Sequence, residues 1–387
     1  MFLAFVILVF IVTLLILVVI HELGHYLAAK KFNIKVLEFG FGIPPRAWGK
    51  KIGETIWSLN WLPFGGFVRL LGEDESDKSV LDDEQSSAEW RKRSFAKAAI
   101  WKRITVVIAG VAMNLLLAWV LFYIVLGAQG FKTQLPLLSD YKFVGVNQTT
   151  DTAIIVGNIA EGSPAQQSGL TDGDRITAFN GSAVTDADQF VAEIKANAGK
   201  EIKLTVSDIQ GNNSREVTLI PRENPPAGQG ALGVSLGGLK TVNLNYETPM
   251  QKLFAGPIHS YNLMAYSGKI LGETIGHSFK EKDIAPVSNA VAGPVGITSV
   301  VAQILSVKNP VIPYLDFVAA LSLNLAVVNV LPFPGLDGGR LFFLVIEGIT
   351  RKKTHAVVEK YVHTIGLLVL LSLIMLITIS DIRKLIF

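Results

Sequence analysis

The chain has 387 residues, of which 50% are hydrophobic and 17% are charged, and its formal net charge is +3. Its mean hydropathy is +0.42, and this balance indicates an integral membrane protein that also has a soluble part. Lys and Arg are interleaved with Asp and Glu, whereas a nucleic-acid interface needs a clustered basic face. Because the chain has no cysteine, disulfides and thiolate zinc sites are excluded and any metal must be held by nitrogen and oxygen.

Four stretches are predicted to cross a membrane, because each approaches the 20 or so apolar residues that a spanning helix needs. They are residues 2–30, 101–127, 311–331 and 361–380. The first stretch does not have the features of a cleaved signal peptide. Residues 1–20 contain no charge, and the run continues into His21 and Glu22 without a small-residue cleavage site.

Basic residues predict the orientation of these spans. They gather between the first two spans and again in the short loop between the last two, and the positive-inside rule assigns both segments to the cytoplasmic side. The termini and residues 128–310 are then extracytoplasmic. The basic residues in question are Lys30, Lys31, Lys35, Lys50, Lys51, Arg91, Lys92, Arg93, Lys102, Arg103, Arg351, Lys352, Lys353 and Lys360.

The segment at about 36–72 alternates aromatic residues with glycine, as in Phe39-Gly40-Phe41-Gly42 and Trp61 to Phe67. It is too short and too rich in glycine for another span, yet too apolar for a solvated loop. We predict a β-hairpin or sheet that enters the membrane from the cytoplasmic side, where protein must cover its backbone. The alternative is an interfacial loop held by its aromatic side chains.

A soluble domain is predicted at 128–240. Its core, at about 152–222, alternates apolar and polar residues in period two, with turn signals such as Asn180-Gly181 between the runs. Helical patterns at 163–169 and 186–196 interrupt these runs. A small β-rich domain with two helices is therefore expected, and residues 241–310 are expected to form a linker with amphipathic helices.

The first span carries His21-Glu22-Leu23-Gly24-His25 in its second half. A helix places residues four apart on one face, so both imidazoles can meet one metal ion, with Glu22 beside it as a candidate base. This spacing is a metalloprotease signature. On a surface helix the pattern is often inert, but polar side chains in lipid are costly unless a metal or another partner compensates them.

Asp337 is the candidate third ligand, because a catalytic zinc takes three protein ligands and leaves a fourth position open. It follows Asn329-Val-Leu-Pro-Phe-Pro-Gly-Leu, where prolines and glycine break the third span. An aspartate that only stabilises the turn before Gly338-Gly339 is the alternative. The other histidines, at 259, 277, 355 and 363, are expected to be ordinary surface or core residues.

Three separated motifs resemble the site-2 protease family of intramembrane zinc metalloproteases: 21–25 in the first span, Gly110-Val-Ala-Met-Asn114 in the second and 329–339 in the third. The bacterial regulator-of-sigma-E protease branch, which carries a PDZ insertion, is the most similar. Residues 39–42 and 63–69 resemble its membrane-re-entrant β-region, and 154–221 resemble its PDZ domain. Many members carry two tandem PDZ domains, whereas this chain has room for one.

The resemblance implies a polytopic α-helical membrane protein of the bacterial cytoplasmic membrane, with four transmembrane helices, a re-entrant β-region and an extracytoplasmic PDZ domain. It implies a Zn²⁺ cofactor and cleavage within or near the transmembrane helix of single-pass proteins, such as anti-sigma factors or remnant signal peptides, with the PDZ domain gating or selecting them. The implied substrate-binding residues are Asn329, Phe39, Gly40, Gly65 and Gly66, and those shaping the site are Asn114, Pro332, Pro334 and Gly338.

Two other interpretations of the residues are a membrane-anchored PDZ scaffold and a transporter. A scaffold, with a structural metal or none, leaves Glu22 without a role in lipid. Broken helices with polar groups also mark transport paths. However, four spans without an inverted repeat, together with a complete His-Glu-x-x-His pattern, argue against transport.

Overall fold

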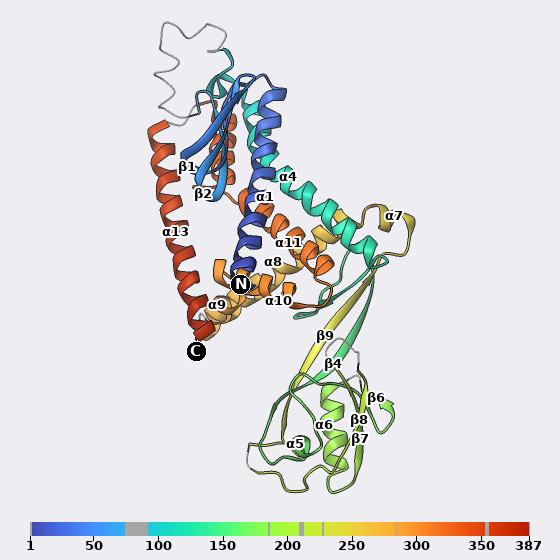
Figure 1. Cartoon of the computed structure of the whole chain (residues 1–387). Coiled ribbons are helices and arrows are strands. Elements are labelled where there is room, and N and C mark those ends of the chain that lie inside the picture. Colours follow the sequence, from blue (N-terminus) through green and yellow to red (C-terminus); the bar gives the residue numbers. More distant parts are fainter. Residues whose placement is uncertain are drawn as a thin grey trace. The chain divides into compact units, whose positions relative to one another are not determined.

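The structure is a computed structural model that describes residues 2–73, 92–184, 186–208, 213–226, 228–283, 285–352 and 356–386. It divides into two compact units, which we describe separately (Figure 1). The helical unit comprises Met1–Ala128 and Leu253–Phe387, and the sheet unit comprises Gln129–Lys252.

Within the described residues, four helices are long and apolar enough to cross a membrane, as the sequence predicts. They are α1 (Phe2–Lys31), α4 (Ile100–Ala128), α11 (Val311–Val330) and the span Val357–Lys384 of α13 (Ala356–Ile386). The last helix is longer at both ends than the predicted 361–380. Its polar first and last turns lowered the hydropathy on which the prediction relied.

Helices α1, α4 and α11 pack closely because small residues lie where they cross. A Cβ atom at Gly24 of α1 would lie 2.2 Å from the carbonyl oxygen of Ala109 on α4. Ala118 of α4 and Ala319 of α11 share a buried cluster. Side chains this small let helix backbones approach one another, which is how helices associate in lipid.

A helix that the sequence analysis did not predict, α12 (Asp337–Thr350), lies between α11 and α13 in the chain. The buried Arg103 of α4 anchors α12 through a bidentate ion pair with Glu347, with nitrogen–oxygen distances of 2.6 and 3.0 Å. At 14 residues, α12 is too short to span a bilayer. A search for apolar runs long enough to span a bilayer therefore misses it.

Strands β1 (Val36–Ile52) and β2 (Thr55–Leu70) form a two-stranded antiparallel sheet. The structure therefore confirms that this segment forms a sheet. Both ends of β2 pair with the first part of β1, since Phe39 is partnered by Val68 as well as by Trp57. Residues 62–70 consequently form an edge of the sheet, and residues 38–41 lie in its interior.

Further helices complete the described part of this region. They are η2 (Phe95–Lys97), α7 (Pro249–Leu253), α8 (Ala255–Glu281), α9 (Ala285–Ala290) and α10 (Pro294–Ser306). Helix α8 packs on α4, where a Cβ at Gly256 would lie 2.2 Å from the oxygen of Trp119. Asp381 of α13 accepts hydrogen bonds of 2.8 Å from the amides of Gly293 and Gly296, which ties α13 to the start of α10.

The sheet unit contains a seven-stranded sheet in the order β3-β9-β4-β5-β7-β8, with β6 paired to β5. Its elements are β3 (Lys132–Pro136), β4 (Asn147–Ile159), α5 (Pro164–Gln167), β5 (Arg175–Phe179), β6 (Ser182–Ala183), α6 (Ala187–Ala196), β7 (Ile202–Ser207), β8 (Arg215–Leu219) and β9 (Val234–Asn245). Asp186 begins α6, because its side chain accepts a hydrogen bond of 2.8 Å from the amide of Gln189. The predicted domain end at residue 240 falls inside β9, which continues by pairing with β3.

Candidate metal centre

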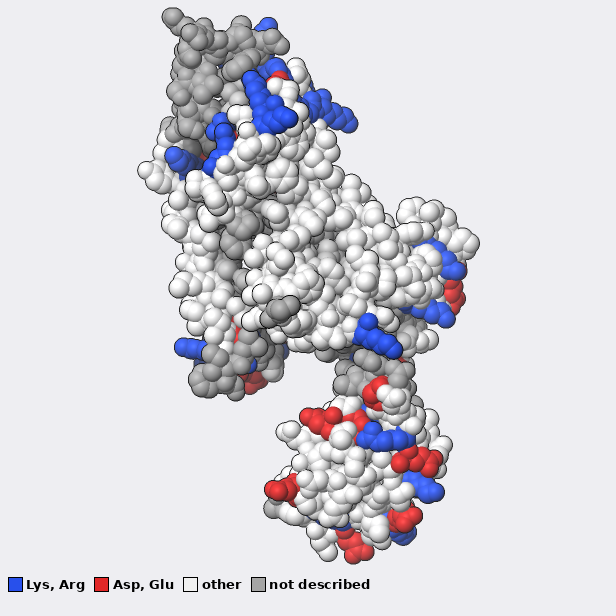
Figure 2. Space-filling model, in the orientation of Figure 1, with Lys and Arg blue, Asp and Glu red and all other residues white. Residues whose placement is uncertain are grey.

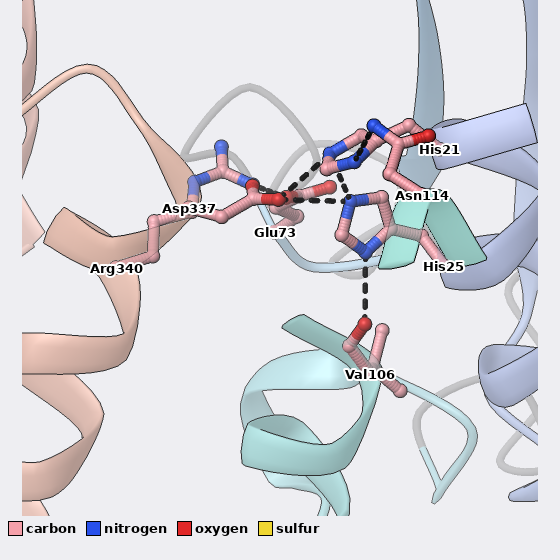
Figure 3. Close-up of polar contacts among 7 residues, drawn as sticks. All are labelled: His21, His25, Glu73, Val106, Asn114, Asp337 and Arg340. Atoms are coloured by element: carbon pink, nitrogen blue, oxygen red, sulfur yellow. Dashed lines mark hydrogen bonds and ion pairs between the residues drawn. The ribbon is translucent and has the colours of Figure 1, made fainter. Parts of the chain in front are cut away.

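Three side chains that can bind a metal converge inside the helical unit (Figure 3). His21 and His25 lie one turn apart on α1, and Asp337 is the first residue of α12. One oxygen of Asp337, Oδ2, lies 2.9 Å from Nε2 of His21 and 3.1 Å from Nε2 of His25, and the two Nε2 atoms are 3.2 Å apart. Residues separated by 316 positions in the chain thus meet, as the sequence analysis predicts.

Contacts behind the two imidazoles aim them at Asp337. The Nδ1 atom of His25 lies 2.8 Å from the carbonyl oxygen of Val106, so this nitrogen carries the proton and Nε2 keeps a free lone pair. The Asn114 amide lies 3.4 Å from Nδ1 of His21. Asn114 is fully buried, and its backbone oxygen accepts a 2.8 Å hydrogen bond from Ser322. It therefore links α4 and α11 beside the three converging side chains.

Gly110 of α4 makes room for both imidazoles. A Cβ atom at this position would lie 2.4 Å from Nε2 of His25 and 2.9 Å from Cε1 of His21. Real Cβ atoms do not approach other atoms this closely, and the atoms they would meet include a candidate metal ligand. In the sequence, Gly110 stands out only as part of a motif, and this role was not predicted.

We therefore expect Gly110→Ala to displace His25 and to remove zinc binding while the chain still folds. The measurement is the zinc content of the purified protein by elemental analysis, compared with its thermal unfolding midpoint. Gly268→Ala is the matched control, because a Cβ there meets nothing within 4 Å on helix α8. Full zinc content in Gly110→Ala would contradict this account of the glycine.

A pocket of about 280 Å³ opens beside the three converging side chains. Glu22, His25 and Asp337 line one part of it. The sheet residues Phe67, Val68, Arg69 and Leu70 line another. Glu22 therefore faces the same space as the candidate ligands.

Glu73 and Arg340 also line this pocket and form an ion pair with each other. Arg340 lies one turn after Asp337 on α12, and both side chains appear beside Asp337 in Figure 3. The sequence analysis missed both residues. The spacing of Arg340 from Asp337 was a signal from which Arg340 could have been found. No local pattern connects Glu73 to the site.

The loop at 331–336 delivers Asp337 to the site. Gly338 packs on the end of α11, where a Cβ would lie 2.0 Å from the oxygen of Leu331, and Gly335 has φ +97°, a conformation that favours glycine. Pro334 packs against α13, whereas Pro332 is exposed. Asn329 is half-buried in the last turn of α11.

The structure separates the predicted substrate-binding residues of the sheet. Gly66, at the edge, lies next to Glu22, because a Cβ there would be 3.4 Å from Cγ of Glu22. Gly65 is also on the edge segment, with φ +85°. Phe39 is only 1% exposed and stacks on Trp57 with ring centroids 4.6 Å apart.

Phe39 and Gly40 are thus separated from the edge on which Gly65 and Gly66 lie. Both residues lie on the interior segment of the sheet, between the two ends of β2. Phe67 covers Gly40, since a Cβ there would lie 2.3 Å from the Phe67 ring. The register explains the difference, because an aromatic–glycine pattern does not distinguish an edge strand from an inner one.

The converging side chains fit a zinc ion. Ligand atoms about 2.0–2.1 Å from a tetrahedral zinc lie about 3.3 Å apart, close to the three observed separations. Two imidazole nitrogens and one carboxylate oxygen are also ligand types that zinc accepts.

Comparisons with known proteins identify the family of the chain. The model of Peptidase family M50 matches residues 9–373. A protein of Clostridium perfringens that is named as a zinc metalloprotease is 32% identical over 367 residues, covering 95% of each chain. The regulator of sigma-W protease RasP of Bacillus subtilis is 26% identical over 455 residues, covering 95% of this chain and 96% of its own. The chain therefore belongs to peptidase family M50 and is a zinc metalloprotease.

Proposed function

We propose that this zinc metalloprotease cleaves single-pass membrane proteins within or near their transmembrane helix. The observation that carries the proposal is the location of the site. His21, Glu22 and His25 lie on α1, whose most apolar window has a mean hydropathy of 3.6. A hydrolytic site on such a helix is reached most directly by a substrate that is itself in the membrane.

The proposed ligands are His21, His25 and Asp337, and Glu22 is the proposed general base. A zinc ion held by these ligands supplies Lewis acidity, which polarises a carbonyl group and acidifies a water molecule. Glu22 accepts the proton of the attacking water and delivers it to the leaving amine nitrogen. Val106 and Asn114 keep the imidazoles in the orientation that ligation needs.

The proposed substrate path runs along the edge of the sheet at 62–70. A peptide in a helix hides its carbonyl groups in its own hydrogen bonds, so it must unwind before cleavage. The edge at Gly65 and Gly66 can pair with the unwound backbone as an added strand, and it lies next to Glu22. Asn329, at the end of α11, is proposed to hold the same peptide from the opposite side.

We propose that the end of the helical unit where β1 and β2 begin faces the cytoplasm. Figure 2 shows Lys and Arg side chains at this end, whereas most of the middle of the visible face carries no charge. Lys30 and Lys31 are the last two residues of α1 at this end. The positive-inside rule assigns such an end to the cytoplasm, which makes the sheet unit extracytoplasmic in the bacterial cytoplasmic membrane.

The sheet unit is proposed to act as a PDZ-type domain that selects or gates substrates. A cavity of about 710 Å³ lies in this unit, lined by Asp186 and Asp188 at the start of α6 and by Gly238 and Lys240 of β9. Residues 234–240 of β9 pair with β4 on one side. On the other side, β3 pairs with 241–245 and the Leu137 amide donates to the oxygen of Lys240, so that within the described part of the chain no strand pairs with 234–239 there. An open strand edge beside a helix can accept a peptide as an extra strand.

The proposal is tested with the full-length protein in proteoliposomes and a single-pass membrane reporter. We expect mass spectrometry to place the cut within or next to the reporter's transmembrane helix. A chelator should stop cleavage, and Zn²⁺ should restore it. Cleavage confined to the reporter's soluble segments, or activity that persists in the chelator after zinc has been removed, would contradict the proposal.

A further inference from the structure

The loop that delivers Asp337 has little support of its own. Pro332 and Pro334 have no amide hydrogen to donate. Inside the loop, Phe333 donates to the oxygen of Leu331 at 2.6 Å and Leu336 donates to that of Phe333 at 3.2 Å. Helix α12 begins after Leu336 without a side-chain cap. The position of Asp337 therefore depends on what packs against the loop from outside.

Helix α13 provides that support through one turn of its length. The amide of Gly335 donates a 2.9 Å hydrogen bond to Nδ1 of His363. One turn further along, Gly366 lies flat against the loop, since a Cβ there would be 2.2 Å from the oxygen of Pro334. These contacts are notable because only 6% of the most apolar window of α13 is buried.

The ring of His363 is held in one state by its surroundings. It packs against Phe343 of α12, with ring centroids 5.7 Å apart. Because Nδ1 accepts a hydrogen bond, the ring proton resides on Nε2. That atom is buried and has no hydrogen-bond partner among the described residues. A buried donor without a partner destabilises a fold. That the fold keeps such a donor at Nε2 favours a function for Nδ1, the acceptor on the other side of the ring.

From these contacts we infer that His363 is a positioning residue for the metal centre: it holds Gly335, and through it Asp337, at the place where the two α1 histidines converge. The inference rests on the proposed role of Asp337 as a ligand. Ligand groups must be held to within about 0.5 Å. Loss of residues that orient ligands typically weakens metal binding by about 10- to 100-fold.

The test measures zinc affinity of the full-length protein in detergent by competition with a fluorescent chelator. His363→Phe keeps an aromatic ring against Phe343 but removes the acceptor. His363→Asn places an amide oxygen near the position of Nδ1, and His363→Gln places it near that of Nε2. His277→Phe on α8 is the matched control, because it makes the same change at a histidine away from the loop.

We expect His363→Phe and His363→Gln to weaken zinc binding by about tenfold or more, and His363→Asn to stay within about threefold of the wild type. Wild-type affinity in the Phe variant, or equal losses in Asn and Gln, would overturn the inference. If the Phe variant does not fold, the Asn and Gln pair decides the question. Asp337→Ala in the same assay separates the two proposals, since wild-type affinity there refutes the ligand assignment itself.

Discussion

Replacing Glu22 with glutamine is expected to abolish proteolysis while leaving zinc in place. Glu22 lines the pocket beside His25 and Asp337 but is not one of the three converging ligands. A glutamine amide has nearly the same shape but accepts no proton, and loss of a general base lowers rates by about 100- to 10,000-fold. The measurements are cleavage of the membrane reporter and zinc content by elemental analysis.

The control for this variant is Glu273→Gln, which makes the same chemical change on α8, where Glu273 pairs with Lys269 on the helix surface. Its activity and zinc content should match the wild type. Reporter cleavage at the wild-type rate in Glu22→Gln would remove Glu22 from the mechanism. Loss of zinc together with activity would instead assign Glu22 to metal binding.

Replacing Asp337 with alanine is expected to remove zinc and activity together. The carboxylate is one of the three proposed ligands, and its Oδ2 atom lies within 3.1 Å of both imidazoles. Two histidines alone do not complete a catalytic zinc site. Zinc content should fall from about one ion per chain towards zero, with reporter cleavage at background.

Asp283→Ala serves as the matched control, because Asp283 is an exposed residue just after α8. A second comparison uses Asp337→Asn, which keeps the size of the side chain but removes its charge. We expect it to bind zinc more weakly than the wild type because a neutral amide is a poorer ligand. A full zinc complement in Asp337→Ala would show that the third ligand lies elsewhere.

Most of the metal centre is predictable from the sequence because its parts are locally encoded or stand out in apolar surroundings. His21 and His25 are four residues apart, and helix periodicity alone places them on one face. Asp337 was identified because few ionisable residues occur near the third span. The four apolar helices were likewise visible as runs of hydrophobic residues.

The surroundings of the centre were not predictable in this way. Gly110 and Val106 act on the histidines across the packing of α1 on α4, and the contact between His25 and Val106 joins residues 81 positions apart. His363 was expected to be an ordinary surface or core histidine, yet its Nδ1 atom accepts a hydrogen bond from the amide of Gly335, 28 positions away in the chain. The residues that neighbour these positions in the sequence do not indicate such distant partners.

The sheet shows the same division. Its aromatic and glycine residues predicted β-structure correctly, but pairing decided which of them lie at the edge. Phe39 and Gly66 belong to similar motifs, and only the second lies beside Glu22. A strand pattern specifies which residues share a face, whereas the partner strand and its register depend on contacts along the whole segment.

By itself, the sequence determined the candidate metal-binding pair, the candidate base beside it and the apolar helices that carry them. The physical reason is that helix periodicity and hydropathy depend on neighbours within a few turns. Only the tertiary structure decided that Asp337 meets the two histidines, that Gly110 leaves room for them, and that Gly66 rather than Phe39 lies beside Glu22. Those features depend on packing between segments that are far apart in the chain.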